Sequence, residues 1–224
     1  MKLLVLRPEP GASETAERAR AIGLDPVVAP LFAIIAVAGP PIKAGRFDAV
    51  LLTSANGARH APSGLANLPC FAVGESTAAA ARAAGFADVR TGPCDGAAAA
   101  AMMAAAGLKR ALHLCGREHL AIGAAGVAIE RRIVYAAEPV PRERFEGPAV
   151  AMIHSARAGA RFAELAGDRD AIAVAAISPA AAAAAGEGWA AKAVAKAPRD
   201  QALLELAAKL CNHGLDVVRD GDGI

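Results

Sequence analysis

Short aliphatic runs alternate along the chain with alanine-rich stretches that are long enough to form helices. The aliphatic runs lack polar alternation, so they predict strands that are buried on both faces. Such strands, separated by helix-length connections, are typical of β-α-β units with parallel strands. The predicted strands are Lys2–Arg7, Pro26–Pro30, Asp48–Leu52, Cys70–Val73, Ala111–Leu114, Arg132–Tyr135, Val150–Ile153 and Ile172–Ile177. The clearest predicted helices are Ser13–Ile22, with Gly23 as its C-cap, and Gln201–Cys211.

An internal repeat sharpens this pattern. A strand, a serine and a helix follow one another at Ser54 and again at Ser155. In each copy a second strand–turn–helix unit comes next, over residues 71–81 and 175–183. Two further β-α-β pieces, residues 2–30 and 109–137, accompany the two copies, and Arg117 is expected to open the helix of the second piece. A repeat of this size indicates two similar domains.

The order of these pieces predicts that one domain is inserted into the other. Residues 48–137 form the inserted domain, and residues 1–30 with 148–212 form a discontinuous one. The chain then crosses between them twice, in connectors 31–47 and 138–147, which form a two-stranded hinge. A tandem arrangement split near residue 120 is the alternative. Residues 213–224 lack a core pattern and are expected to be a disordered tail. The predicted fold class is α/β, with two flavodoxin-like domains of parallel sheet.

Composition excludes several classes of protein. Hydrophobic residues make up 55% of the chain, charged residues 21%, and the net charge is +2, so neither intrinsic disorder nor a broad nucleic-acid-binding face is expected. The apolar stretch Ala97–Leu108 is shorter than the ~20 residues that cross a bilayer, so no membrane contact is expected. The first residues lack the long apolar region of a secretory signal, so none is expected, and the protein is predicted to be cytoplasmic.

Cysteines and histidines show no metal-ligand spacing. The four cysteines are scattered, and they are expected to be reduced, with Cys70 and Cys115 as small core residues. His113 lies within a predicted strand and is expected in the core. His154 precedes Ser155, but adjacent strand residues point to opposite faces and no G-x-S-x-G motif is present, which disfavours a hydrolase.

Polar residues gather where the predicted strands end and helices begin. Hydroxyl residues in such places are ordinarily N-caps. In a parallel sheet, however, helix N-termini meet at the edge where ligands bind, and their free N–H groups favour an anion. Arginines at the same ends fit carboxylates or phosphates, whereas GxGxxG and GxxxxGK[ST] motifs are absent, which argues against nucleotides. The residues concerned are Ser54, Ser76, Thr77, Ser155 and Ser178, with Arg7, Arg59, Arg117 and Arg157.

These residues, in this order, resemble the uroporphyrinogen-III synthase family. The matching motifs cover most of residues 1–185 and are Arg7-Pro8, Leu52–Gly57 (LTSANG), Val73–Ala78 (VGESTA), Leu114–Glu118 (LCGRE) and Ile133–Tyr135 (IVY). The resemblance implies two α/β domains joined by a two-stranded connector, with the substrate in the cleft between them. It implies a cyclising hydro-lyase that dehydrates the linear tetrapyrrole hydroxymethylbilane and inverts its last pyrrole ring, ring D. No metal or organic cofactor is implied.

The resemblance also implies roles for particular residues. Tyr135 matches the tyrosine proposed to assist departure of the substrate hydroxyl, and is expected to be catalytic. Expected substrate contacts are Thr77 with Gly74 and Ser76 in the same turn, Ser54 and Ser155 after their strands, and, as a further extension, Arg7 and Arg157. The chain departs from the family where it has Ser178 and Ala181 in place of Gly and Thr.

The resemblance bears on partners and on alternative functions. We expect a monomer that makes at most transient contact with the enzyme that supplies its substrate. A non-catalytic binder of a polycarboxylate or tetrapyrrole is the first alternative, and a nucleotide-using transferase is the second.

Overall fold

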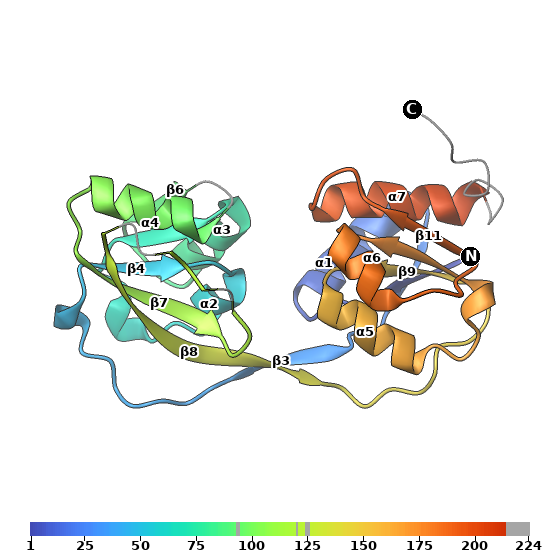
Figure 1. The fold of residues 1–224 in the computed structure, drawn as a ribbon, viewed down its shortest axis with the longest axis horizontal. Coiled ribbons are helices and arrows are strands. Elements are labelled where there is room, and N and C mark those ends of the chain that lie inside the picture. The colour runs from blue at the N-terminus through green and yellow to red at the C-terminus, as the bar shows by residue number, and fades with distance from the viewer. Residues whose placement is uncertain (93–94, 120, 124–125, 214–224) are drawn as a thin grey trace. The chain divides into compact units, whose positions relative to one another are not determined.

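The computed structural model describes residues 1–92, 95–119, 121–123 and 126–213. The chain forms two compact units (Figure 1). Unit 1 consists of Met1–Ala33 and Pro139–Ile224, and unit 2 of Ile34–Glu138. Each unit is built on a mostly parallel sheet, which confirms the predicted α/β fold class. The tail expected at residues 213–224 lies, from residue 214 on, outside the described residues.

Unit 1 contains a five-stranded sheet in the order β11-β10-β9-β1-β2, in which all neighbouring strands are parallel. Its aliphatic strands are buried on both faces, as their composition requires. The strands are β1 (Lys2–Val5), β2 (Asp25–Val28), β9 (Ala149–Ile153), β10 (Ile172–Ala176) and β11 (Ala191–Val194). The helices are α1 (Gly11–Ala21), α5 (Ala156–Leu165), α6 (Pro179–Ala185) and α7 (Asp200–His213), with a short 3₁₀ turn, η3 (Arg169–Ala171).

Helices cover both faces of this sheet. Leucines of helix α7 pack against β1, β9 and β10 in one hydrophobic cluster. Helix α1 contributes small residues to this cluster. On the other face α5 and α6 pack closely together, because Gly159 allows the α6 backbone to approach. Trp189 stacks on Phe162 of α5 at a ring-centroid distance of 5.3 Å, so it is the packing residue that the sequence suggested.

Unit 2 contains a six-stranded sheet in the order β3-β8-β7-β4-β5-β6. Helices α2 and α3 contact one face of it, and α4 contacts the other. The strands are β3 (Phe32–Ala36), β4 (Ala49–Leu52), β5 (Cys70–Val73), β6 (Val89–Gly92), β7 (Arg110–Gly116) and β8 (Ala128–Pro139). The helices are α2 (Ala55–Arg59), α3 (Glu75–Ala83) and α4 (Gly96–Ala105), with 3₁₀ turns η1 (Ala44–Arg46) and η2 (Ser63–Leu65).

The internal repeat is visible in the strand order. Strands β6, β5, β4, β7 and β8 of unit 2 follow one another in the same spatial order as β11, β10, β9, β1 and β2 of unit 1. Helix α4, which follows β6, therefore corresponds to α7, which follows β11. The segment after β7 corresponds to the one that forms α1 after β1. This correspondence allows the two ligand edges to be compared position by position.

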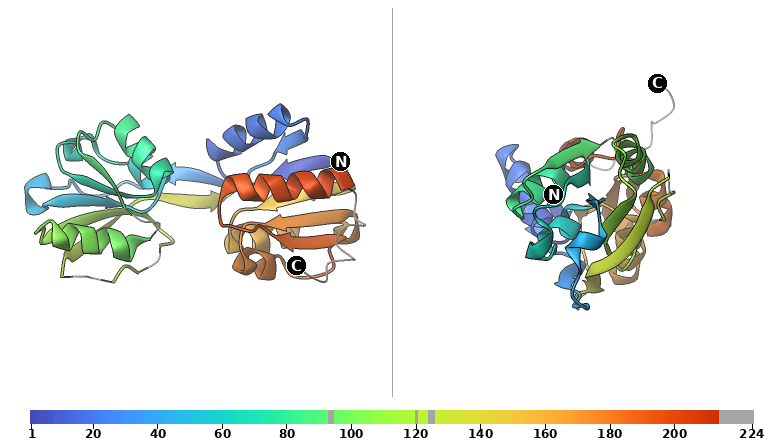
Figure 2. Two further views of the ribbon diagram at one scale, coloured as in Figure 1. Left: turned by 90° about the horizontal axis from the view of Figure 1, so that it is seen from above. Right: turned by 90° about the vertical axis from the view of Figure 1, so that its left-hand side faces the viewer.

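Strands β3 and β8 lie side by side in opposite directions where the chain passes between the units (Figure 2). Val37 N donates to Val134 O over 2.9 Å, and Val140 N donates to Leu31 O over 2.9 Å. The two connecting segments are thus paired with each other.

Two sequence-based expectations need correction. Strands β6 and β11 were not predicted, because they are short edge strands whose polar and small residues hide the aliphatic pattern, whereas β3 lies in the expected connector 31–47. The helix expected to open at Arg117 does not form in the described residues between β7 and β8. Gly126 has a φ of +80°, which an α-helix does not contain. Among the described helices, none combines the length and apolar character needed to cross a membrane.

The close approach of α5 and α6 yields a test of the fold. A Cβ at position 159 would lie 2.7 Å from Ala181 O and 3.0 Å from Ala185 N. Gly159→Ala should lower the free energy of unfolding in urea by about 1–3 kcal/mol despite the better helix propensity of alanine. Gly45→Ala, whose Cβ would meet nothing within 4 Å, is the control. Equal stability of both variants would contradict the packing described.

Candidate functional site

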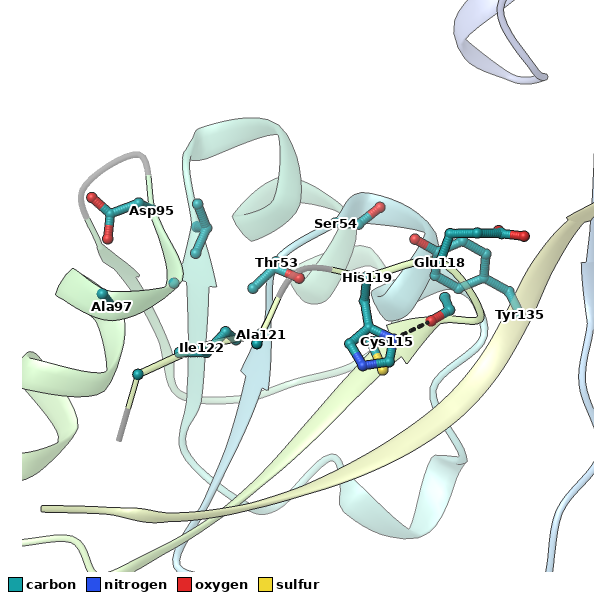
Figure 3. A pocket seen from close by; sticks show the side chains of 14 residues that line it. Thr53, Ser54, Asp95, Ala97, Cys115, Glu118, His119, Ala121, Ile122 and Tyr135 are labelled. Carbon is teal, nitrogen blue, oxygen red and sulfur yellow. Dashed lines mark hydrogen bonds between the residues drawn. The ribbon is translucent and has the colours of Figure 1, made fainter. Parts of the chain in front are cut away.

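A pocket of about 580 Å³ opens at the carboxyl ends of β4, β5 and β7 in unit 2 (Figure 3). Its walls are the residues that end these strands, the first turn of α4, the described residues 118, 119 and 121–123, and Tyr135 of β8. Thr53 and Cys115 lie on the sheet side, and Ile122 packs against the start of α4. Ligands of open parallel sheets bind at this edge.

Tyr135 reaches the pocket because of a bulge in β8. The register with β7 shifts between Cys115 and Gly116, so that Gly116 faces Tyr135. A Cβ at position 116 would lie 2.7 Å from Tyr135 Cζ, so the phenol ring rests directly on the glycine backbone. The His60 ring stacks on Tyr135 at 6.0 Å with an interplanar angle of 26°. These contacts fix the ring, and no hydrogen bond to the Tyr135 hydroxyl is made by the described part of the chain.

Two helices begin at the pocket with a side-chain cap. Ser54 Oγ accepts a hydrogen bond from Asn56 N over 3.2 Å at the start of α2. Asp95 Oδ1 accepts one from Ala98 N over 2.7 Å at the start of α4. Figure 3 places Asp95 at one end of the pocket and Tyr135 at the other, with Thr53 between them. Carboxylates therefore lie at both ends of the pocket, Asp95 at one and Glu118 beside Tyr135 at the other.

One histidine lines the pocket, and a second is buried behind Thr53. His113 is buried, and its Nε2 lies 2.9 Å from Thr53 Oγ1. His119 lines the pocket, with Nδ1 3.0 Å from Gly116 O and Nε2 3.3 Å from Arg131 Nη1. Burial, with smaller contributions from the charges of His119 and Arg131, lowers the pKa of His113 to about 4. His113 is thus a neutral side chain near pH 7, and its predicted place in the core is confirmed.

The predicted substrate contacts of α3 lie beside the pocket and do not line it. Gly74 is the N-cap of α3 with a φ of +76°, a conformation that favours glycine. Ser76 and Thr77 therefore lie in the first helical turn, and the prediction that they are N-caps is wrong. Ser76 is exposed and Thr77 is buried. Of the predicted residues in unit 2, Ser54 and Tyr135 line the pocket.

In unit 1 the predicted serine caps are present. Ser155 Oγ accepts from Ala158 N over 3.1 Å at the start of α5, and Ser178 Oγ accepts from Ala181 N over 3.3 Å at the start of α6. Arg157 places its guanidinium 4.4 Å from the centroid of the Phe32 ring. His154 bonds to Asp200 rather than to Ser155, which agrees with the absence of a Ser–His dyad.

A cluster around Asp200, the first residue of α7, occupies the position in unit 1 that corresponds to the pocket. His154 Nε2 lies 2.7 Å and Arg7 Nη1 2.8 Å from Asp200 Oδ1, and Thr15 Oγ1 donates over 3.1 Å. Arg18 is a further ion-pair partner. Burial would raise the pKa of Asp200, but the hydrogen bond and charge of His154, with Arg18 and Arg7, outweigh it and hold that pKa well below its usual range. Arg7 thus already has a carboxylate partner.

The two units differ in the segment that comes after the equivalent strands β1 and β7. After β1 the chain forms α1, whose Thr15 and Arg18 fill the space over the sheet end. After β7 the described residues form no helix, and the space stays open as the pocket. Unit 1 therefore closes its ligand edge with its own carboxylate, whereas unit 2 leaves the same edge accessible.

The described cysteines and histidines do not cluster as metal ligands. Within residues 1–92, 95–119, 121–123 and 126–213, no group of three or more His, Cys, Asp or Glu side chains could hold a metal ion. Cys70 and Cys115 are buried and unpaired, as predicted, whereas Cys94 lies outside the described residues. Burial, helped by the charge of Asp88, raises the pKa of Cys70 to about 12, so this thiol stays protonated.

The sequence matches a known protein family over most of its length. The sequence pattern of the family described as uroporphyrinogen-III synthase HemD matches residues 13–205. The chain belongs to the uroporphyrinogen-III synthase family. A search of curated protein sequences found no match. The family assignment confirms the resemblance seen in the sequence motifs.

Two solved structures support the fold of this family member. Uroporphyrinogen-III synthetase from Helicobacter pylori is 17% identical, with a TM-score of 0.65, over 93% of this chain and 98% of that one. A mutant uroporphyrinogen III synthase from Thermus thermophilus is also 17% identical, with a TM-score of 0.51, over 94% of this chain and 99% of the other. At this identity the likeness shows a shared fold.

Sequence reasoning missed four residues of the site in this uroporphyrinogen-III synthase family member. Thr53 stands in the LTSANG motif, but only the adjacent serine was singled out. Asp95 directly precedes an alanine-rich run, which is an N-cap signal. Nothing in the sequence indicates that His113 and His119 meet below Thr53, because the segment between them reverses direction.

The Asp200 cluster predicts a pH-dependent contribution to stability. A carboxyl whose pKa is lowered on folding stabilises the native state above its unfolded pKa, near 4, and this stabilisation is lost as the pH falls further. Asp200→Asn should therefore lower the free energy of unfolding by about 1–3 kcal/mol at pH 7, with a smaller difference from wild type at pH 2.5. Urea titrations at both pH values measure this.

The matched control for that experiment is Asp25→Asn, since Asp25 is exposed on an edge strand. It should change stability by less than about 0.5 kcal/mol at either pH. A difference for Asp200→Asn that is as large at pH 2.5 as at pH 7 would contradict the ionised cluster.

Proposed function

We propose that the protein is a uroporphyrinogen-III synthase, which dehydrates and cyclises hydroxymethylbilane to uroporphyrinogen III with inversion of ring D. Membership of the family supports this proposal. The observation that carries it within the structure is the pocket at the ligand edge of unit 2, with the Tyr135 hydroxyl at its margin. Both the pocket and the tyrosine lie where a parallel sheet binds its ligands.

The first chemical step is loss of the substrate's hydroxyl group as water. The C–O bond breaks, the departing oxygen takes a proton, and a cationic azafulvene remains. Tyr135 is the proposed proton donor, since its ring is fixed by Gly116 and His60 while its hydroxyl is not engaged by described protein groups. The substituted α-carbon of ring D then bonds to this cation and forms a spiro-pyrrolenine, after which its bond to the methylene of ring C breaks and leaves a second azafulvene cation on ring C. The free α-carbon of ring D closes on that methylene, and the proton it loses as the ring regains aromaticity restores the tyrosine. The net change is loss of one water.

The enzyme's larger task is to control which carbon of ring D reacts. The reactive pyrroles close without help to the unrearranged type I isomer, so the protein must hold ring D with its substituted α-carbon toward the cation. A spiro-pyrrolenine intermediate and a rearrangement follow from that attack. Positioning of the substrate therefore contributes more to the outcome than any strong acid or base.

The substrate's carboxylates require several donors. We propose that the helix N-termini supply them through backbone N–H groups, at α3 with Gly74, Ser76 and Thr77, at α2 with Ser54, and at α5 with Ser155. Arg157 and Arg7 stay in the proposal as cationic contacts. Arg7 already binds Asp200, so it would contact the substrate from within that ion pair.

The isomer assay tests this function. Purified protein is mixed with freshly generated hydroxymethylbilane, the products are oxidised, and type I and type III uroporphyrins are separated by chromatography. We expect mainly type III, in an amount that rises with protein concentration. Type I alone at the spontaneous rate, from protein shown to be folded, would contradict the proposal and favour a non-catalytic binder.

The role of Tyr135 can be tested against a neighbour in the same pocket. Tyr135→Phe removes only the proposed proton donor and should lower kcat for type III formation by about 10²-fold. Ser54→Ala removes a cap on α2 and should have a clearly smaller effect, about tenfold or less. Near-wild-type rates for both variants would remove Tyr135 from the mechanism.

The importance of the contact between the Tyr135 ring and Gly116 can be tested without changing the tyrosine. Gly116→Ala places a methyl group where the ring now lies, so Tyr135 must move. We expect kcat/KM to fall about 10–100-fold, since small misplacements of a catalytic group have effects of this size. Gly64→Ala, where a Cβ would meet nothing within 4 Å, is the control for the added methyl group. Unchanged activity of Gly116→Ala would show that the ring position does not matter.

A further inference from the structure

The buried His113 and the pocket residue Thr53 form a pair that the mechanism above does not use. His113 lies in the middle of β7, next to Leu51 of β4 on one side and Arg131 of β8 on the other. It is 1% exposed, and its Nε2 lies 2.9 Å from Thr53 Oγ1. Thr53 itself lines the pocket. The pair therefore connects the core of the sheet to the space where a ligand binds.

The hydrogen-bond pattern of His113 decides which nitrogen carries the proton. Nδ1 is buried and has no partner in the described structure. Because burial keeps the imidazole neutral near pH 7, one nitrogen carries a proton and the other a lone pair. A buried N–H without an acceptor is rarer in proteins than an acceptor with an unused lone pair. The proton therefore belongs on Nε2, which donates it to Thr53 Oγ1.

This arrangement fixes the direction of the Thr53 hydroxyl. Since Thr53 Oγ1 accepts from His113, its own hydrogen cannot point toward the imidazole. The described protein groups offer Thr53 no second hydrogen-bond partner. The hydroxyl hydrogen is consequently directed into the pocket, where a bound molecule would meet a donor.

We propose that Thr53, oriented by His113, donates a hydrogen bond to an oxygen atom of the substrate in the unit 2 pocket. His113 is then a positioning residue, and Thr53 is the binding residue. The inference rests on the proposed function, which supplies a substrate rich in acceptor oxygens. Two sources of that oxygen exist, a carboxylate side chain and the departing hydroxyl, and both require a donor at this point.

Four variants test the pair by kinetics. Thr53→Val keeps the shape and removes the donor, so kcat/KM for type III formation should fall about tenfold. Thr53→Ser keeps the hydroxyl and should stay within about twofold of wild type. His113→Leu should lower kcat/KM by about as much as Thr53→Val. His113→Gln, whose amide N–H can replace Nε2–H, should restore most of the activity.

The double variant separates a positioning role from two independent effects. If His113 acts through Thr53, Thr53→Val/His113→Leu should be no worse than Thr53→Val alone. A loss equal to the product of the two single losses would overturn the inference, as would full activity of Thr53→Val. A rise in KM at constant kcat identifies a carboxylate as the acceptor, whereas a fall in kcat identifies the departing hydroxyl.

A spectroscopic measurement tests the geometry whether or not the protein is a synthase. ¹⁵N-resolved imidazole spectra of the folded wild-type protein at pH 7 should show His113 protonated on Nε2 and unprotonated on Nδ1. The opposite tautomer would overturn the inference, because Thr53 would then donate to His113. This measurement does not need the His113→Leu variant to fold.

Failure of the proposed function can be recognised separately. If wild-type protein makes no type III isomer, binding of the stable octacarboxylate uroporphyrin III is followed by tryptophan and porphyrin fluorescence. A dissociation constant about tenfold higher for Thr53→Val than for wild type would support the donor role in a binding protein. Equal affinity, or no binding to either protein, would overturn it.

Discussion

The point at which strand order reverses in each parallel sheet determines where the rest of the chemistry lies. In unit 1 the neighbours β9 and β1 lead to helices on opposite faces. In unit 2, β4 leads to α2 on one face, and Ile122 and Val127 after β7 pack on the other. Connections that diverge in this way leave a crevice at the carboxyl ends of the strands. Polar side chains there must find partners in the protein or in a ligand, because most side chains of the strands below them are buried and apolar. Because the fold is repeated, each unit has such a crevice with polar side chains that need partners.

The polar side chains at this crevice have different partners in the two units. In unit 1, α1 covers the crevice and brings Arg18 and Thr15 to the Asp200 carboxylate, which Arg7 and His154 also bind, so the charges compensate one another inside the unit. In unit 2 the corresponding helix is missing from the described segment, and the crevice remains a pocket with hydroxyl and carboxylate groups along it. A duplicated fold can in this way assign stability to one edge and ligand binding to the other. The difference arises from a local change in one connection and not from a change in the sheets.

The sequence predicts the part of this fold that depends on local pattern. Fully buried strands and the serine caps at positions 54, 155 and 178 are recognisable because aliphatic runs and N-caps have local signatures. The edge strands β6 and β11 were missed because polar and small residues interrupt the aliphatic pattern. The Arg7–Asp200 pair joins residues at opposite ends of the chain, so its charges looked available for a ligand when the sequence was considered alone. Ser54 and Tyr135 were found through motifs, whereas Thr53 and His113 become a pair only when β4 and β7 are adjacent.

Strand β8 links the site to the connection between the units. It carries Tyr135 and continues to Pro139, beyond which Val140 N bonds to Leu31 O. The bulge at Gly116 lets the strand keep its pairing with β7 while it turns the phenol ring onto the glycine backbone. A side chain held by a strand and a glycine has little freedom to adjust, which suits a group that must meet one oxygen of the substrate. Thr53 directly follows β4, and its hydroxyl group is held by His113 of β7. Both hydroxyls are therefore positioned by the sheet itself and not by flexible loops.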